Sequence, residues 1–318
     1  MGEHKVYGDS TVFCRGRFVS GPDARHCIAS VVMICLPSVL WHIYVDRFLV
    51  ERAGSFLVFC TTLLQLSSIG LLLATAFSDP GIVPRQEPFT EQYDASTKSF
   101  RIKQPPRYFD IVLRGHNFKL KYCTTCNIYR PPRCTHCSVC ENCVERFDHH
   151  CPWIGNCVGK RNYRLFYSFV MTTGALNVVT LATASAQVGD TTSFRSSRLG
   201  ESTGRALVAA MGEHPASVAL AVYATALVWF TVGLCMYHTY LVATNQTTYE
   251  QVKGTYVDHN PFGQGVLRNF RDVLCSPVRP RYFDARTGSM RWPAVATKSN
   301  ATMRTPQTIR TSDIKLNE

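Results

Sequence analysis

Residues 123–157 read CTTCNIYRPPRCTHCSVCENCVERFDHHCPWIGNC, and this stretch decides what kind of domain the chain can form. It holds eight of the chain's fourteen cysteines and three histidines, which makes eleven side chains that can bind a metal ion. A structural zinc site fills all four positions with Cys or His ligands. The residues between these groups are polar and rich in proline, so a purely apolar role for the cysteines does not fit. The stretch therefore predicts a fold that bound metal stabilises.

The spacing leaves the assignment of ligands open. Two tetrahedral sites would use eight of the eleven groups and leave three. Cys123 with Cys126, and Cys137 with Cys140, form two C-x2-C pairs, and each pair needs two more ligands to complete a site. A single zinc on both pairs is the alternative, but it leaves two further cysteines and three histidines without a role. Two interleaved Cys3His sites are more economical, although spacing alone does not choose the partners.

Four apolar windows dominate the rest of the chain, at residues 27–45, 56–77, 165–188 and 216–242. Each has about the 20 mostly apolar residues that a membrane-spanning helix needs. A buried core helix is the alternative for any one window, but four windows of this length in one chain favour transmembrane helices. Polar residues inside or beside the windows blur their edges; these are His42, Gln65, Asn177 and His238.

The distribution of Lys and Arg predicts the orientation of these helices. Segments 1–26, 78–164 and 243–318 carry 29 of the 34 basic residues, and the loops 46–55 and 189–215 carry the other five. Cytosolic flanks of membrane spans carry the excess of positive charge. No cysteine lies in those two loops, which fits reduced thiols in the cytosol. The net charge of +12 fits contact with the lipid bilayer rather than with nucleic acid.

The expected fold is therefore an α-helical polytopic membrane protein. It has four transmembrane helices, a cytosolic zinc-binding cysteine-rich domain between the second and third, and both termini in the cytosol. Residues 85–107 are predicted as a proline-rich loop, and alternation in 107–123 predicts a hairpin around Arg114 and Gly115. The tail at 276–318 is rich in Thr, Arg, Pro and Ser and is predicted to be disordered.

The motifs, taken together, are similar to those of a known family. The pattern C-x2-C-x9-HC-x2-C-x2-C-x4-DHHC-x5-C resembles the cysteine-rich domain of the DHHC-type protein S-acyltransferases, or palmitoyltransferases, here at 123–163. Four further motifs extend the resemblance, namely DPG at 79–81, RPPR at 130–133, TTYE at 247–250 and NPFGQGVLRNF at 260–270. The last two lie in 243–275, directly after the fourth window. The resemblance covers roughly residues 13–272.

The resemblance implies an allocation of the eleven groups. One structural zinc would be held by Cys123, Cys126, His136 and Cys143, and the other by Cys137, Cys140, His150 and Cys157. Spacing alone also allows the opposite choice between the two adjacent histidines, and the resemblance decides it. Cys134 stands where the family tolerates various residues and is read as incidental. His149 and Cys151 are then left for chemistry.

The resemblance also implies a role for each remaining group. Cys151 would take an acyl group from acyl-CoA, here palmitoyl-CoA, and pass it to a cysteine of a membrane-associated protein. A neighbouring base activates a thiol by removing its proton, and His149 would be that base. Asp148 would orient the imidazole, and Thr248 would contact Asp148 in turn.

Further residues are expected to contact the co-substrate. Trp153, Phe166 and Phe169 would line the upper part of an acyl-chain cavity, with ordinary helix packing as the alternative. The phosphates of CoA could meet four basic residues whose alternative role is as solvated or lipid-facing charges; they are Arg130, Arg133, Lys160 and Arg161.

The partners and the competing functions complete the expectations. The sequence around the DHHC motif looks like the subgroup that acylates Ras-type proteins and often works with a small accessory subunit. A zinc-stabilised membrane adaptor without catalysis is one alternative, but the intact DHHC and TTxE motifs argue against it. A transporter is another, but the four windows are poor in ionisable groups. The Golgi, the ER and the plasma membrane are all compatible with these expectations.

Overall fold

The computed structural model describes residues 7–86, 92–94, 99–101, 105–113, 115–257, 259–278, 280–284 and 289–290. The chain forms two compact units. The helical unit comprises Arg25–Thr75 and Arg164–Tyr240. The cysteine-rich unit comprises the described parts of Met1–Ala24, Ala76–Tyr163 and Leu241–Glu318. The cysteine-rich unit is thus assembled from three separate stretches of chain.

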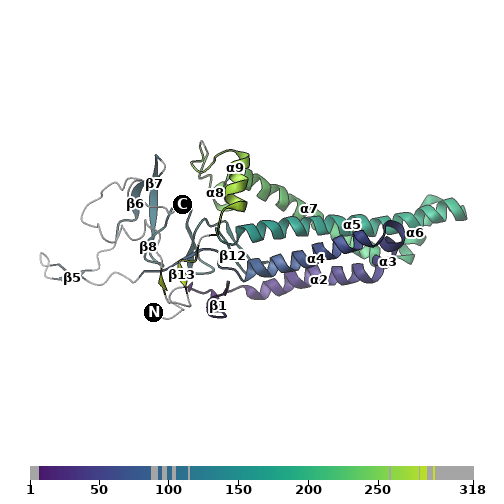
Figure 1. The fold of residues 1–318 in the computed structure, drawn as a ribbon, viewed down its shortest axis with the longest axis horizontal. Coiled ribbons are helices and arrows are strands. Elements are labelled where there is room, and N and C mark those ends of the chain that lie inside the picture. Colours follow the sequence, from purple (N-terminus) through teal and green to yellow (C-terminus); the bar gives the residue numbers. More distant parts are fainter. Residues whose placement is uncertain are drawn as a thin grey trace. The chain divides into compact units, whose positions relative to one another are not determined.

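The helical unit is a bundle of long apolar helices (Figure 1). They are α2 (Ala24–Tyr44), α4 (Ser55–Ala76), α5 (Tyr163–Leu199) and α7 (Pro215–Thr244), and all four are long and apolar enough to cross a membrane. Large apolar side chains point outward, among them Phe56, which is 75% exposed, and Trp229, which is 84% exposed. Such exposure suits a lipid environment and not water. The four membrane-spanning helices predicted from the sequence are confirmed.

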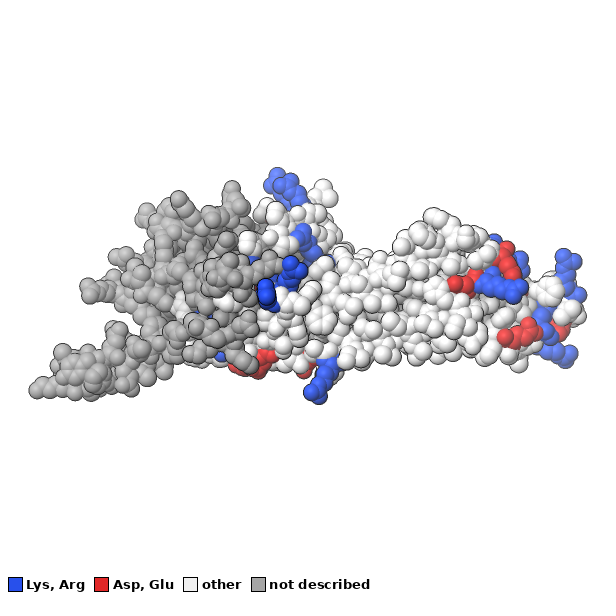
Figure 2. Space-filling view, turned by 60° about the horizontal axis from the view of Figure 1, so that its bottom comes forward, with Lys and Arg blue, Asp and Glu red and all other residues white. Residues whose placement is uncertain are grey.

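Charged side chains gather at one end of this bundle. On the face seen in Figure 2, its surface is uncharged over most of its length and carries both signs of charge at one end. Residues of the predicted loops 46–55 and 189–215 form the ion pairs Arg52–Asp190 and Arg195–Glu201. The uncharged band is the part that hydrocarbon can surround at little cost.

The two short loops predicted from the sequence contain helices. The loop 46–55 contains α3 (Asp46–Ala53), and within 189–215 α5 runs on to Leu199 before α6 (Thr203–Glu213) begins. On α6, Ala206 and Ala210 are four residues apart and fully buried, so one face of this helix packs against the unit. Hydropathy marked only the apolar windows and therefore missed these more polar helices.

The polar residues of the apolar windows have partners in neighbouring helices. Nε2 of His42 lies 2.7 Å from Oε1 of Gln65, and Nδ2 of Asn177 lies 3.3 Å from Oγ1 of Thr231. His238 packs edge-on against a phenylalanine ring of α5. Polar side chains inside a membrane bundle commonly join helices in this way.

The cysteine-rich unit is built from short antiparallel strands. Its sheets are β1 (Thr11–Phe13) with β2 (Phe18–Ser20); β3 (Ile82–Val83), β10 (Asn142–Val144) and β9 (Thr135–Cys137); β6 (Tyr108–Leu113), β7 (His116–Cys123) and β8 (Ile128–Tyr129); and β11 (His149–Cys151) with β12 (Asn156–Val158). The predicted hairpin is confirmed as β6–β7, with Gly115 in its turn at a φ of 78°. The predicted loop 85–107 contains one further strand pair, β4 (Gln92–Asp94) with β5 (Ser99–Arg101).

The segment after α7 contributes the last elements of this unit. It contains α8 (Thr248–Val252), α9 (Val266–Phe270), the π-helical turn η1 (Arg271–Cys275), and the strand pair β13 (Phe283–Asp284) and β14 (Ser289–Met290). The prediction of disorder from 276 onward is wrong for this strand pair. The hydroxyl of Tyr282 donates to Glu145 at 2.8 Å, and Phe283 packs edge-on against Tyr7. These partners are far away in the sequence, so composition did not reveal them. Residues 291–318 lie outside the described residues.

The N-terminal arm packs against the turn between β11 and β12. The side-chain amide of Asn156 donates to the carbonyl oxygens of Val19, Ala76 and Ser78 at 3.0–3.2 Å. Gly155 has a φ of 72°, and a Cβ atom there would lie 2.5 Å from the carbonyl oxygen of Asp23. Only glycine tolerates both that backbone conformation and that contact.

Replacing Gly155 by alanine should therefore destabilise the protein more than Gly115→Ala does. Both sites have positive φ, but nothing lies within 4 Å of a Cβ at Gly115. Gly115→Ala should cost only backbone strain of about 1–2 kcal/mol, whereas Gly155→Ala adds a steric cost of about 1–3 kcal/mol. Thermal unfolding in detergent measures the difference, and equal shifts in the two variants would contradict this packing.

Candidate functional site

Side-chain alternation in β11 separates the two adjacent histidines. Successive residues of a strand point to opposite faces. His149 and Cys151 therefore share one face of β11, and His150 points to the other. The register places His150 directly opposite Cys157 on β12. The hairpin thus sends one histidine toward a cluster of thiols and leaves the other beside Cys151.

The second metal cluster consists of Cys137, Cys140, His150 and Cys157. One ligand atom from each residue lies within 4.8 Å of all the others. Nδ1 of His150 lies 3.4 Å, 3.7 Å and 3.8 Å from the sulfur atoms of Cys140, Cys157 and Cys137. Tetrahedral zinc with ordinary Zn–S and Zn–N bond lengths places nitrogen and sulfur about 3.6 Å apart. The three cysteines are at most 5% exposed, so this donor set fits zinc closely.

The first metal cluster arises from the same alternation in β9 and β10. His136 lies directly opposite Cys143, whereas the next residue, Cys137, points the other way and joins the second cluster. Cys123 and Cys126 complete the first set, again within 4.8 Å of one another. Nδ1 of His136 lies 3.5 Å and 3.9 Å from the sulfur atoms of Cys126 and Cys143. The structure thus explains why the two sites interleave in the sequence.

The outer nitrogen of each of these two imidazoles meets a carboxylate. Nε2 of His150 lies 3.0 Å from Oδ2 of Asp23, and Nε2 of His136 lies 3.7 Å from Oε2 of Glu141. Sequence reasoning missed both carboxylates. Of the two cysteines of this region outside the clusters, Cys134 is 8% exposed and packs with the thiols of the first cluster.

On the other face of β11, Asp148 holds the ring of His149. Nδ1 of His149 donates to Oδ2 of Asp148 at 2.7 Å, and the Asp148 side chain is fully buried. Burial by itself lowers the pKa of His149, but hydrogen bonds to Asp148 and to Cys151 outweigh it and raise the pKa to about 10. The imidazole between these two side chains therefore accepts a proton readily. The structure brings together the three residues that the resemblance assigned to chemistry.

Helix α8 fixes the position of the Asp148 carboxylate. The backbone N–H and the hydroxyl of Thr248 donate to the two carboxylate oxygens of Asp148 at 2.9 Å and 2.7 Å. Thr247 is the N-cap of this helix and forms a capping box with Glu250. The TTYE motif thus has a structural explanation, because one threonine starts the helix and the next contacts Asp148.

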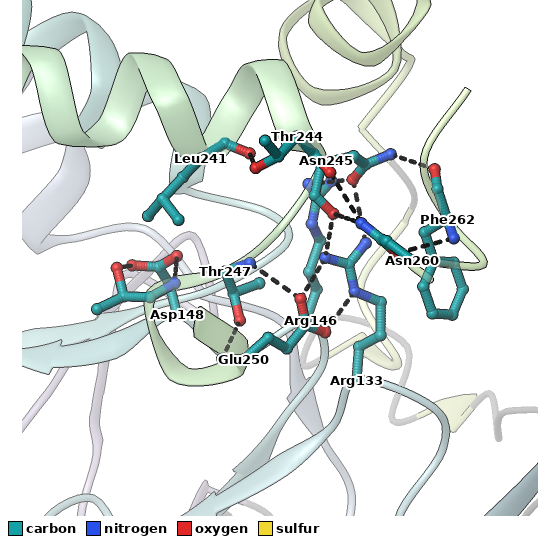
Figure 3. A network of polar contacts seen from close by, with 11 residues as sticks. Arg133, Arg146, Asp148, Leu241, Thr244, Asn245, Thr247, Glu250, Asn260 and Phe262 are labelled. Carbon is teal, nitrogen blue, oxygen red and sulfur yellow. Dashed lines mark hydrogen bonds and ion pairs between the residues drawn. The ribbon is translucent and has the colours of Figure 1, made fainter. Parts of the chain in front are cut away.

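A buried ion pair connects α8 to the segment between β8 and β9 (Figure 3). Nε and one terminal nitrogen of Arg133 donate to the two carboxylate oxygens of Glu250 at 2.7 Å and 2.6 Å. The same guanidinium donates to the carbonyl and side-chain oxygens of Asn245 at 2.9 Å and 3.1 Å, and lies over the ring of Phe262. Asn260 donates to the carbonyl oxygen of Asn245 at 3.2 Å. The network joins the RPPR, TTYE and NPFGQG motifs, a relation that sequence reasoning did not predict.

Comparison with known proteins identifies the class to which this geometry belongs. A family described as DHHC palmitoyltransferase matches residues 116–255. The chain is 38% identical to the probable protein S-acyltransferase 7 of Arabidopsis thaliana, over 94% of this chain and 69% of the relative. The chain therefore belongs to the DHHC palmitoyltransferase family. It is also 36% identical to palmitoyltransferase ZDHHC9 of Bos taurus, over 89% of this chain and 78% of the relative.

Membership of the DHHC family makes the chain a protein S-acyltransferase, as the sequence motifs predicted. The two competing predictions, a membrane adaptor without catalysis and a transporter, are therefore not supported. Palmitoyltransferase ZDHHC14 of Mus musculus matches at 38% identity over 88% of this chain and 58% of the relative. Plant and animal relatives match this chain at similar identities of 36–38%, so these comparisons do not single out one subgroup. Membership of the Ras-type subgroup stays a prediction.

The four basic residues predicted to meet CoA are bound within the cysteine-rich unit. Arg133 is 8% exposed and forms an ion pair with Glu250, and its contact with a CoA phosphate stays a prediction. Burial lowers the pKa of Arg130, but the charges of Cys143 and Cys123 and a hydrogen bond to Cys123 outweigh burial and raise the pKa overall. The two others pair with carboxylates, Lys160 with Glu145 at 2.6 Å and Arg161 with Asp79 at 3.4 Å.

The three predicted cavity residues differ in burial. Trp153 lies in the turn after β11 and is 52% exposed. On α5, Phe166 is 2% exposed and packs edge-on against His238, and Phe169 is half-buried. The acyl-chain cavity stays a prediction.

The variant Glu250→Gln should strongly destabilise the protein. Glutamine keeps the length and the capping contact, but it leaves the buried Arg133 charge without its partner, which costs about 3–5 kcal/mol. Glu51→Gln makes the same change in the Arg47–Glu51 pair, whose side chains are 92% and 63% exposed, and should have little effect. Thermal unfolding in detergent compares the two; a Glu250→Gln protein as stable as Glu51→Gln would rule out an important ion pair.

Proposed function

We propose that the chain transfers a long-chain acyl group from acyl-CoA to cysteine thiols of membrane-associated proteins through an acyl-enzyme on Cys151. Palmitoyl-CoA is the proposed donor. The observation that supports this most directly is the shared face of β11, where the Cys151 side chain meets an imidazole fixed by Asp148. Nucleophile, base and orienting carboxylate thus follow one another in the order that thiol catalysis requires.

In the first step, His149 removes the proton of Cys151, and the thiolate attacks the carbonyl carbon of the acyl-CoA thioester. A carbon–sulfur bond to Cys151 forms and the carbon–sulfur bond to CoA breaks. The CoA thiolate leaves with the proton that the imidazolium carries. Asp148 stabilises that imidazolium, since its carboxylate accepts from Nδ1 at 2.7 Å.

In the second step, the thiol of a substrate protein repeats the exchange. His149 takes its proton, the substrate thiolate attacks the acyl carbon, and the bond to Cys151 breaks. The proton returns to Cys151, and the enzyme is regenerated. Both steps exchange one thioester for another, so neither needs an external energy source.

Two structural zinc ions are proposed for the two Cys3His clusters. Each would be bound by three thiolates and one imidazole, which leaves no open position for substrate. The metal would thus supply shape and no chemistry. It would fix β11 and β12 through His150 and Cys157, and so place the face that bears Cys151.

The membrane location accounts for the substrate class. Each methylene of an acyl chain in hydrocarbon contributes about 0.8 kcal/mol to membrane binding, so the chain of the donor favours the bilayer. We place both termini and the cysteine-rich unit in the cytosol, as the distribution of Lys and Arg indicates. The proposed contacts for CoA phosphates remain the four basic residues Arg130, Arg133, Lys160 and Arg161. An accessory subunit remains a prediction of the resemblance.

Cys151→Ser should abolish formation of the acyl-enzyme. The purified protein in detergent is incubated with labelled palmitoyl-CoA, and hydroxylamine-sensitive label on the protein is measured. The control is Cys134→Ser, which removes another buried thiol of the same unit and should keep the label. Zinc content should stay near two per chain in both variants. Label that persists in Cys151→Ser would refute the proposed nucleophile.

Removing the base or its support should slow acylation by graded amounts. His149→Ala should lower the rate by about 10²–10⁴-fold, the usual contribution of a general base. Thr248→Val removes one hydrogen bond to Asp148 and should lower it by about tenfold or less. Single-turnover acylation measures both rates. Thr225→Val, on an exposed threonine that bonds only its own helix, is the control; a loss as large as that of Thr248→Val would assign the effect to general destabilisation.

A further inference from the structure

Asp23 connects the N-terminal arm to the second metal cluster. It stands directly before the first residue of α2, far from the cysteine-rich stretch in the sequence. Its Oδ2 lies 3.0 Å from Nε2 of His150, whose Nδ1 faces the three thiols. His150 is 11% exposed at its side chain, so few other partners can reach this ring. None of the motifs quoted from the sequence includes Asp23.

The backbone that leads into Asp23 is held by contacts at Val19 and Gly21. The N–H of Val19 donates to the carbonyl oxygen of Phe77 at 2.9 Å, and Asn156 donates to the carbonyl oxygen of Val19 at 3.2 Å. A Cβ at Gly21 would lie 2.4 Å from the carbonyl oxygen of Gly155. Main chain therefore packs directly on main chain here. The carboxylate reaches His150 from a rigid position and not from a flexible arm.

The geometry determines which proton the imidazole carries. If Nδ1 gives its lone pair to the metal, the neutral ring must have its proton on Nε2. A carboxylate that accepts this proton fixes the tautomer and the orientation of the ring and makes it a better ligand. We propose that Asp23 is a positioning residue of the second metal cluster, which orients His150 toward the metal and so steadies the strand that carries Cys151.

The first cluster provides an internal comparison. Its imidazole, on His136, meets the carboxylate of Glu141 only at 3.7 Å, beyond hydrogen-bond distance, and that carboxylate is 37% exposed. The two clusters therefore differ in how well their imidazoles are supported. Loss of Asp23 should loosen one zinc ion and leave the other unchanged.

A simpler role for Asp23 is to cap α2. Aspartate is a preferred N-cap residue, and Asp23 occupies the position before Ala24. Serine also caps helices well, but its hydroxyl is too short to replace the carboxylate at His150. Asparagine caps equally well and keeps an oxygen that can accept from Nε2. The two substitutions therefore separate the capping role from the positioning role.

The test uses the full chain in detergent and rests on the zinc content proposed above. Zinc-loaded protein is challenged with a chelator, and release is followed with a metal-sensitive dye. In Asp23→Ala and Asp23→Ser, one of the two ions should leave about 10–100-fold faster, the usual effect of losing such a partner. Asp23→Asn should show a smaller change. Asp110→Ala, which removes an exposed carboxylate on β6, should behave like the wild type.

Alkylation with mass spectrometry identifies which thiols become accessible first. The expected result is faster modification of the second cluster, with unchanged rates at the first; the responding residues are Cys137, Cys140 and Cys157. Release from Asp23→Ser at the wild-type rate would overturn the proposal, and so would equal acceleration at both clusters. If Asp23→Ala does not fold, the serine and asparagine variants decide by the same criteria.

A failure of the underlying zinc proposal has a different signature. Wild-type protein that binds fewer than two zinc ions would contradict the two-site assignment and the inference built on it. Wild-type protein with two ions, and an Asp23→Ser variant with unchanged release, would overturn only the role of Asp23.

Discussion

The arrangement of three thiols and one imidazole around each of two points is the constraint on which the cysteine-rich unit depends. Its strands are only two to eight residues long, too short to build a core from apolar side chains alone. Alternation along β9 and β11 distributes neighbouring residues between opposite faces. The same alternation that sends His150 to the thiols sends His149 and Cys151 to the other side. The proposed metal ligand and the proposed nucleophile therefore lie on opposite faces of one hairpin.

The face of β11 that carries His149 and Cys151 depends in turn on a second layer of buried polar contacts. The Asp148 carboxylate is fully buried and accepts hydrogen bonds from His149 and twice from Thr248. The helix that carries Thr248 is anchored by the pair of Glu250 with Arg133. A buried charge without a partner is costly, so this layer forms completely or not at all. The three sequence motifs that looked independent are parts of this one layer.

The sequence allowed prediction of features that are local along the chain. Apolar length predicted the four membrane helices, and alternation predicted the β6–β7 hairpin. The resemblance to the DHHC family, and not spacing alone, predicted the eight ligands that the structure groups into two clusters. It failed where a residue's role is set by a distant partner. The ion pair of Arg133 with Glu250 was not predicted, because the two residues are 117 positions apart in the sequence. Asp23 showed no signal because its partner is 127 residues away, and Tyr282 looked like part of a disordered tail because Glu145 is 137 residues away.

The discontinuous construction of the cysteine-rich unit has a consequence for biosynthesis. Both clusters can gather their ligands once residues 123–157 have been made. The support for Asp148 comes 100 residues later, after the fourth membrane helix. A nascent chain can therefore bind its metal well before it can align its reactive thiol. Under the proposed mechanism, catalysis would have to wait until the fourth membrane helix and α8 have been made. An incomplete chain in the membrane would then hold all the proposed metal ligands while Asp148 still lacks Thr248.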